Sequence, residues 1–231
     1  MQMLRRLLCT AVLLTLSGVV AAAPAAPLAP KEGVHYKALA QKMETPHGKQ
    51  VEVIEFFAYA CPHCNVFEPL LADWVKKQGN NIVFKRVHVA GGARALPQLR
   101  MFATLEALGL VEQYHGKLFA AMHEQGVRFA DDEQVLDWVA KAGIDRARFT
   151  DAYRSMGVQS RVRRATSMMN DYKIDHWPMV AIDGRFITSP SMANPEESHS
   201  HGSHAHSELE QQQVALQVMD ALVAKAKADK K

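Results

Sequence analysis

The chain has 231 residues, 48% of them hydrophobic and 22% charged, and a formal net charge of +3 at pH 7. This composition is typical of a soluble globular chain that can bury a core, and we expect one domain with room for a large insertion. No dense stripe of Lys and Arg with interleaved aromatic residues is present, so the sequence argues against a nucleic-acid partner.

Residues 1–23 have the pattern of a secretory signal peptide. Arg5 and Arg6 precede an apolar run at residues 7–20, and three alanines follow at residues 21–23. The run is too short for a comfortable membrane span and ends in small residues, so we expect cleavage after this stretch rather than anchoring. The sequence therefore predicts an exported protein.

The stretch at residues 24–32 contains several Ala and Pro residues, and we expect it to form a flexible lead-in rather than part of the core. Cys9 lies within the predicted signal peptide and would leave with it. The mature chain would then keep two cysteines, Cys61 and Cys64.

A nearly continuous apolar run at residues 51–59 predicts a strand that is buried on both faces. It leads directly into the sequence Cys-Pro-His-Cys at residues 61–64, after which apolar residues recur at helical spacing as far as Gly79. The motif therefore opens a helix, and Pro62 suits its first position because the missing N–H would be unpaired there anyway. A second strand is predicted at residues 82–89.

The second half of the chain is predicted to be mostly helical. Apolar residues recur at helical spacing throughout residues 94–174, which predicts an all-helical block. Strand character returns at residues 179–182 and 185–188, and Asp183-Gly184 between them is a two-residue hairpin signal. A final helix is predicted over about residues 208–227.

The spacing and setting of the two cysteines suit thiol–disulfide exchange. The attacking species is a thiolate, and a helix start favours one because unpaired N–H groups of the first turn point at it. We expect Cys61 to be this thiolate, with the N–H groups of His63 and Cys64 directed at its sulfur and the His63 ring adding positive charge. A lower pKa of Cys61 stabilises the reduced form, which makes the disulfide a stronger oxidant. Cys64, one turn inward, is expected to be the less accessible partner.

Three other interpretations of the motif stay open. A structural disulfide would gain only about 2 kcal/mol, because the loop that it closes is very short. Half of a zinc site would need histidines in place of a second cysteine pair. A thioredoxin-type reductant or a disulfide isomerase would use the same fold and the same two cysteines.

The predicted order of elements is that of a thioredoxin-like α/β fold with an inserted all-helical subdomain. The segment Glu-Phe-Phe-Ala-Tyr-Ala-Cys-Pro-His-Cys at residues 55–64, the later His88-Val89, the helical block and Trp177-Pro178 before a hairpin resemble the DsbA family of periplasmic dithiol oxidases. The resemblance spans residues 33–188 and the last helix. It implies the following division: a thioredoxin-like domain at residues 33–93 and 175–230, and a helical insertion at residues 94–174.

The resemblance also implies an activity and a place of action. We expect a monomeric periplasmic protein that donates its Cys61–Cys64 disulfide to newly exported proteins. Its reoxidation would be carried out by a quinone-linked membrane oxidase of the DsbB type, so that no bound cofactor is required.

Glu55 lies six residues before Cys61 in a strand that is predicted to be buried. By resemblance it is the buried acid that exchanges a proton with Cys64 during each turnover. The alternative is a carboxylate at a strand edge that faces water. His88 matches the family pattern, although a lone histidine at a strand end is more often a structural residue.

Pro178 is a candidate cis-proline, because X-Pro bonds with an aromatic residue before proline favour the cis form. By resemblance its loop faces the CxxC motif and presents backbone groups to an extended substrate peptide. Trp177 departs from the small or β-branched residue usual before this proline, and we expect it to contribute to substrate binding. The alternative is a proline that merely begins an edge strand.

A histidine-rich segment at residues 196–207 departs from the family. Its composition is typical of a solvated linker, and it is also compatible with binding a transition metal. A periplasmic metal-binding protein that uses the two cysteines and this segment is therefore the second class of function. Its histidines are His199, His201, His204 and His206.

Overall fold

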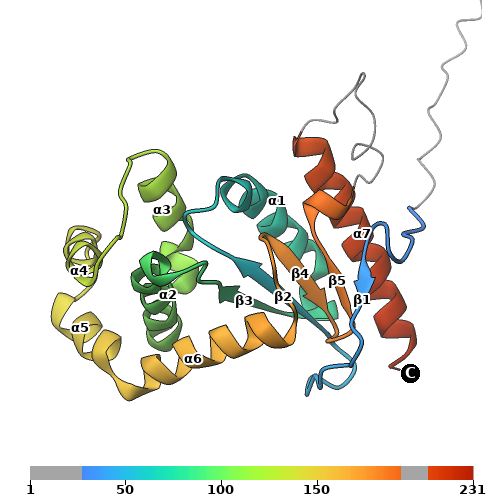
Figure 1. Cartoon of the computed structure of the whole chain (residues 1–231), viewed down its shortest axis with the longest axis horizontal. Coiled ribbons are helices and arrows are strands. Elements are labelled where there is room, and N and C mark those ends of the chain that lie inside the picture. The colour runs from blue at the N-terminus through green and yellow to red at the C-terminus, as the bar shows by residue number, and fades with distance from the viewer. Residues whose placement is uncertain (1–27, 194–207, 231) are drawn as a thin grey trace, which may run out of the picture.

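The structure is a computed structural model and describes residues 28–193 and 208–230 (Figure 1). Its centre is a five-stranded sheet with the strand order β1-β5-β4-β2-β3. The β2–β3 pair is parallel, whereas the other three pairs are antiparallel. The strands are β1 (Lys37–Ala38), β2 (Val51–Phe57), β3 (Ile82–His88), β4 (Met179–Ile182) and β5 (Phe186–Thr188).

Two groups of helices surround this sheet (Figure 1). Apolar side chains of α1 and α7 share one core with the sheet, whereas α2 to α6 form a lobe that shares a second core with it. All five helices of the lobe lie between β3 and β4 in the sequence. The helices are α1 (Pro62–Gln78), α2 (Leu96–Leu108), α3 (Val111–His123), α4 (Asp132–Lys141), α5 (Arg146–Arg154), α6 (Met156–Asp171) and α7 (Glu208–Ala228).

The central strand β2 is buried along its whole length, as its apolar sequence predicts. Successive side chains of a strand point to opposite faces of the sheet. Val53 accordingly packs in the core shared with α1 and α7, and Ile54 and Phe56 pack in the core shared with the helical lobe. Glu55 belongs to the first set by this alternation, so its carboxylate lies on the side of the sheet that carries α1.

The predicted elements are confirmed, with small differences at their ends. β2 and β3 end at Phe57 and His88, two residues and one residue earlier than predicted, and β5 begins at Phe186. β1 was not predicted from the sequence; it pairs only Lys37 and Ala38 with β5. Two exposed residues without an apolar pattern give no strand signal.

The turn between β4 and β5 differs from the prediction. Asp183 and Gly184 both have positive φ, at 53° and 61°, as a hairpin signal requires. Ile182 nevertheless pairs with Phe186, so three residues rather than two form the loop. A side chain on Gly184 would collide with the backbone of Met43, which explains why this close approach requires glycine.

Several predicted features lie outside the described residues. They are the signal peptide at residues 1–23, the first four residues of the lead-in (24–27), and the histidine-rich segment at residues 196–207. The domain boundaries after residues 93 and 174 stay a prediction. Within the described ranges, no helix combines the length and hydropathy needed to cross a lipid bilayer.

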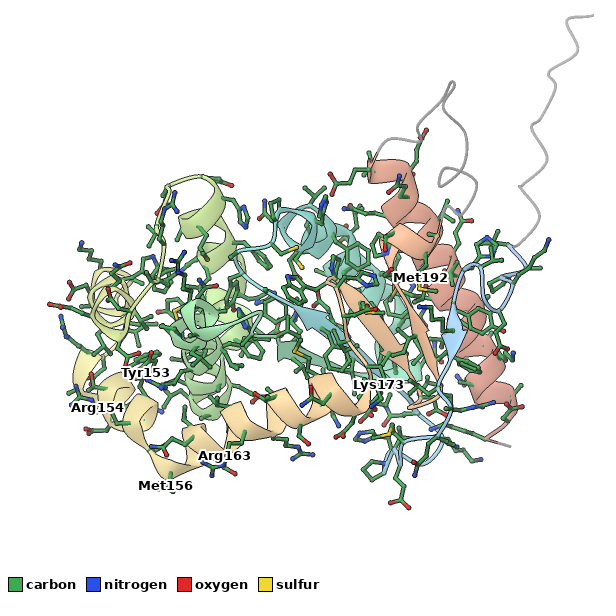
Figure 2. The ribbon with its side chains drawn as sticks, in the orientation of Figure 1. Tyr153, Arg154, Met156, Arg163, Lys173 and Met192 are labelled. Carbon is green, nitrogen blue, oxygen red and sulfur yellow. The ribbon has the colours of Figure 1, made fainter. Side chains whose placement is uncertain are left out.

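The outer surface of the helical lobe carries exposed side chains. Figure 2 shows Met156 at the start of α6 and Arg163 further along this helix, both pointing away from the sheet. Met156 is 70% exposed. The two cysteines lie elsewhere, where β2 meets α1.

Candidate active site

Cys61 caps the N-terminus of α1. It follows the end of β2, has an extended backbone with φ −85° and ψ 118°, and Pro62 occupies the first turn of the helix as predicted. Its Sγ accepts a hydrogen bond from the Cys64 backbone N–H at 3.3 Å. Cys61 is 8% exposed and Cys64 is 0% exposed, so Cys64 is the less accessible partner. Both are free thiols in this structure.

The two cysteines differ in acidity. A hydrogen bond from the Cys64 thiol, the backbone N–H groups of Cys64 and His63, and the charge of His63 lower the pKa of Cys61 to about 6, against the effect of burial. Burial raises the pKa of Cys64 far above its ordinary value, and the neighbouring Cys61 sulfur adds to this effect. At neutral pH the reduced pair therefore consists of a Cys61 thiolate and a Cys64 thiol.

The Trp177–Pro178 peptide is cis, as predicted. The loop that carries it faces the CxxC motif, because the Cys61 thiol lies within donating distance of the Trp177 carbonyl oxygen, at 3.5 Å. Pro178 is buried directly before β4, and β4 is the strand next to β2 in the sheet. An extended chain that binds this loop would therefore pass next to Cys61.

A hollow of about 620 Å³ lies beside Cys61, and the half-buried Trp177 forms part of its wall. The loop after β3 also lines the hollow, through Gly91, Gly92 and Arg94. A Cβ atom on Gly91 would come within 2.8 Å of the Trp177 indole, so the absence of a side chain there lets the ring approach the loop closely. The bulky Trp177 is thus accommodated by a glycine on another segment.

We expect Gly91→Ala to displace the Trp177 indole, to lower the unfolding free energy by about 1 kcal/mol, as mild overpacking does, and to slow the reaction with a cysteine-containing peptide. Chemical denaturation and stopped-flow mixing of the oxidised protein with the peptide measure the two effects. Gly116→Ala is the matched control, because nothing except its chain neighbours and the backbone of its own helix lies within 4 Å of the added methyl group. If Gly91→Ala behaved like this control, the contact with Trp177 would have no influence on the site.

Glu55 is completely buried, which rules out the alternative of a carboxylate that faces water. Arg86 lies beside it, with its Nε 3.2 Å from Oε2 of Glu55, but the two atoms are not aligned for a hydrogen bond. Burial and the charge of Glu68 raise the pKa of Glu55 to about 8, although Arg86 opposes the shift. Glu55 therefore holds a proton at neutral pH, close enough to both cysteines to act on them electrostatically.

The sequence analysis missed the partners of Glu55. Arg86 donates to Oε1 of Glu68 at 2.7 Å, and Nε2 of His115 lies 3.2 Å from the other oxygen of Glu68. The His115 Nδ1 and the Tyr59 hydroxyl are 2.9 Å apart. These residues come from β3, α1, α3 and the end of β2, so only tertiary packing brings them together. One sign of these partners is present in the sequence, which is the pair of basic residues Lys85 and Arg86 inside the strand predicted at residues 82–89.

His88 is a structural residue, in agreement with the simpler prediction. Its side chain is completely buried, and its Nε2 accepts a hydrogen bond from the Tyr59 backbone N–H at 3.2 Å. Burial lowers the pKa of His88 to about 3, so the ring is neutral. Through this hydrogen bond it fixes the backbone just before the motif.

His63 lies at the surface of the site, between two hollows. One is the hollow described above, and the other, of about 330 Å³, separates the Pro178 loop from the start of α7. The His63 Nδ1 is 2.6 Å from a carboxylate oxygen of Glu208 on α7. In residues 28–193 and 208–230, no three side chains of His, Cys, Asp or Glu gather to hold a metal ion.

Comparisons with known proteins agree with this geometry. A family model described as a DSBA-like thioredoxin domain matches residues 52–199. The thiol:disulfide interchange protein DsbA of Burkholderia cepacia is 41% identical over 193 residues, which are 83% of this chain and 90% of that protein. The protein of the same name from Bordetella parapertussis is 40% identical over 150 residues, which are 65% of this chain and 70% of that protein.

Solved structures show the same fold. The crystal structure of Pseudomonas aeruginosa DsbA aligns with a TM-score of 0.74 and 25% identity over 85% of this chain and 94% of that one. A variant of Proteus mirabilis DsbA, solved with a non-covalently bound peptide, aligns with a TM-score of 0.68 and 24% identity over 85% of this chain and 100% of that one.

Proposed function

Because the chain belongs to the DsbA family of thiol:disulfide oxidoreductases, we propose that it is an oxidase, which donates its Cys61–Cys64 disulfide to paired thiols of newly exported proteins. The observation that carries this direction is the position of the Cys61 sulfur at the N-terminus of α1, where it accepts the Cys64 N–H. A site that stabilises the Cys61 thiolate stabilises the reduced protein, and a stable reduced form makes the disulfide a strong oxidant.

The reaction consists of two exchange steps. A substrate thiolate attacks the Cys61 sulfur of the disulfide, a substrate–Cys61 bond forms, and the electron pair of the broken bond goes to Cys64. A second substrate thiolate then attacks the substrate sulfur of this mixed disulfide and releases Cys61 as a thiolate. Two electrons pass from the substrate to the protein. The substrate loses two protons, of which Cys64 takes one and solvent the other.

Glu55 is the proposed proton donor to Cys64 in the first step. Its carboxyl group is protonated at neutral pH because its pKa is raised to about 8, and it lies close enough to Cys64 for the two groups to influence each other electrostatically. Cys64 leaves as a buried thiolate with a strongly raised pKa, so it takes up a proton readily. Reoxidation of the dithiol requires the reverse transfer, for which Glu55 is the acceptor.

The Pro178 loop is the proposed binding site for substrate. The Trp177 carbonyl group beside Cys61 offers a backbone partner to an extended peptide, and the Trp177 ring forms a wall of the adjoining hollow. The non-covalent peptide complex of the Proteus mirabilis relative supports this class of ligand.

The setting of the reaction is also a proposal. The pattern at residues 1–23 and the family support a periplasmic location. We propose a monomer without bound cofactor, whose dithiol is reoxidised by a quinone-linked membrane oxidase of the DsbB type. A disulfide bond is then the only redox group that the chain itself contributes.

The reduction potential of the Cys61–Cys64 pair tests the direction of the reaction. We expect a value near about −120 mV, whereas a reductant of the thioredoxin type has about −270 mV, a difference of roughly 7 kcal/mol. The protein is equilibrated in glutathione buffers, and the alkylated active-site peptide is quantified by mass spectrometry. A value close to that of thioredoxin would overturn the oxidase and favour a reductase or isomerase of the same fold.

A further inference from the structure

The N-terminus of α7 contacts the active-site motif through the carboxylate of Glu208. Oε1 of Glu208 is 2.6 Å from Nδ1 of His63 and accepts a longer hydrogen bond, of 3.4 Å, from Nε2 of Gln212. Gln212 is 1% exposed, so its amide is fixed in the core and orients the carboxylate from behind. Gln212 and Glu208 thus connect the buried face of α7 to His63, which lies between the two cysteines.

His63 is the group in this contact that acts on Cys61. Its backbone N–H and its positive charge both lower the pKa of Cys61, whereas Glu208 is not among the groups with the largest effects on that pKa. The hydrogen bond to Glu208 raises the pKa of His63, and so does the negative charge of the Cys61 thiolate. The effect of Glu208 on the thiolate is therefore indirect and passes through the imidazole ring.

We propose that Glu208 is a positioning residue for the redox pair, which holds His63 as a cation beside the Cys61 thiolate through the bond to Nδ1. The proposal rests on the proposed function for its biological meaning, because a stabilised thiolate defines an oxidase. The thiolate, the imidazolium and the carboxylate form a row of alternating charge at the mouth of the site.

This arrangement predicts a specific dependence on pH. Below the ordinary pKa of histidine, about 6.5, His63 is a cation whether or not Glu208 is present. Above it, the contact with Glu208 keeps the proton on His63, and the stabilisation of the thiolate is lost only as the pH rises through the raised pKa of His63. The effect of Glu208 should therefore be small at pH 5.5 and clear at pH 7.5.

Other charged groups near His63 come from two neighbouring segments. Arg94 shares one hollow with His63, and His176 lines both hollows. Asp175 lines the first hollow and binds Nδ1 of His176 at 2.6 Å. A substitution at position 208 leaves all three unchanged, so their contributions cancel when the variant is compared with the wild type.

The test is Glu208→Gln, which keeps the shape of the side chain and removes its charge. We expect the equilibrium constant for oxidation of glutathione to fall about two- to five-fold at pH 7.5, the range for an exposed ion pair, and to stay unchanged at pH 5.5. The pKa of His63, followed by NMR of the ring nitrogens, should fall. Glu210→Gln is the matched control, because it removes the same charge from the same turn of α7 and Glu210 is not among the groups that act on His63.

A double-mutant cycle separates positioning from a structural role. In a His63→Ser background, Glu208→Gln should no longer change the glutathione equilibrium at either pH. An equal change in that background, or an unaltered pKa of His63 in Glu208→Gln, would overturn the proposal. The pH titration of the Cys61 thiolate, read from its ultraviolet absorbance, keeps the two proposals apart: it reports the Glu208 effect even if the potential of the wild type proves to be that of a reductant.

Discussion

Replacement of Cys64 by serine is expected to give a protein that captures one partner molecule at Cys61 and then stops. The thiolate at the start of α1 stays reactive because it keeps the backbone N–H groups and His63, but no second sulfur can release the bound partner. With oxidised glutathione, the variant should form a stable adduct with one glutathione, seen by intact mass, and lose all turnover of a dithiol substrate. In the reduced wild type, alkylation of Cys61 should slow as the pH falls through about 6, because the thiolate takes up a proton there.

Cys61→Ser is the paired control. It leaves Cys64, which has no exposed surface and a pKa raised by burial, so this thiol should form the glutathione adduct far more slowly. Comparable rates of adduct formation in the two variants would contradict the assignment of Cys61 as the reactive sulfur. Both variants also lose turnover, so the adduct rather than the activity distinguishes them.

Replacement of Glu55 by glutamine should stabilise the reduced protein, and the gain should grow with pH. Below pH 4.5 the carboxyl group is protonated in both the folded and the unfolded state, and it adds no pH dependence. Between pH 4.5 and about 8 only the unfolded state loses the proton, so the unfolding free energy of the wild type falls by up to about 5 kcal/mol. Glutamine does not titrate. Denaturant unfolding of both proteins at pH 4, 6 and 8 measures the difference.

Glu52→Gln provides the comparison within the same strand. Glu52 is also buried, but Lys85 binds it at 2.6 Å and His47 at 2.9 Å, so we expect this substitution to destabilise the protein at neutral pH. Glu55→Gln should in addition slow substrate oxidation, because Cys64 loses its proton donor. A stability difference between wild type and Glu55→Gln that does not change with pH would show that Glu55 titrates normally.

The parts of the site that sequence reasoning predicted are those that depend on neighbours along the chain. The apolar run of β2 specifies a buried strand, and Cys61 follows it directly, so the position of the sulfur at a helix start could be derived from the order of residues. The burial of Glu55 followed from the same run. Local pattern was sufficient wherever a property is set within one strand or one turn.

The parts that could not be predicted depend on packing between distant segments. His115 contacts Glu68 because α3 packs against α1, and Glu208 contacts His63 because α7 returns to the same face of the sheet. No spacing of residues in the sequence predicts either of these two contacts. The loop between β4 and β5 was predicted one residue too short because its length depends on register, whereas the signal Asp-Gly specifies only the positive φ angles.

The sheet order brings together segments of the active site that are far apart in the sequence. Phe56 of β2 pairs with Met179 of β4, and the carbonyl group beside Cys61 belongs to Trp177. A chain made from its N-terminus therefore presents its two cysteines long before it presents the strand and loop that complete the site. Such distant pairings form slowly. The loop that would bind substrate beside Cys61 is thus completed only after residues 177–188 have been made, long after the CxxC motif.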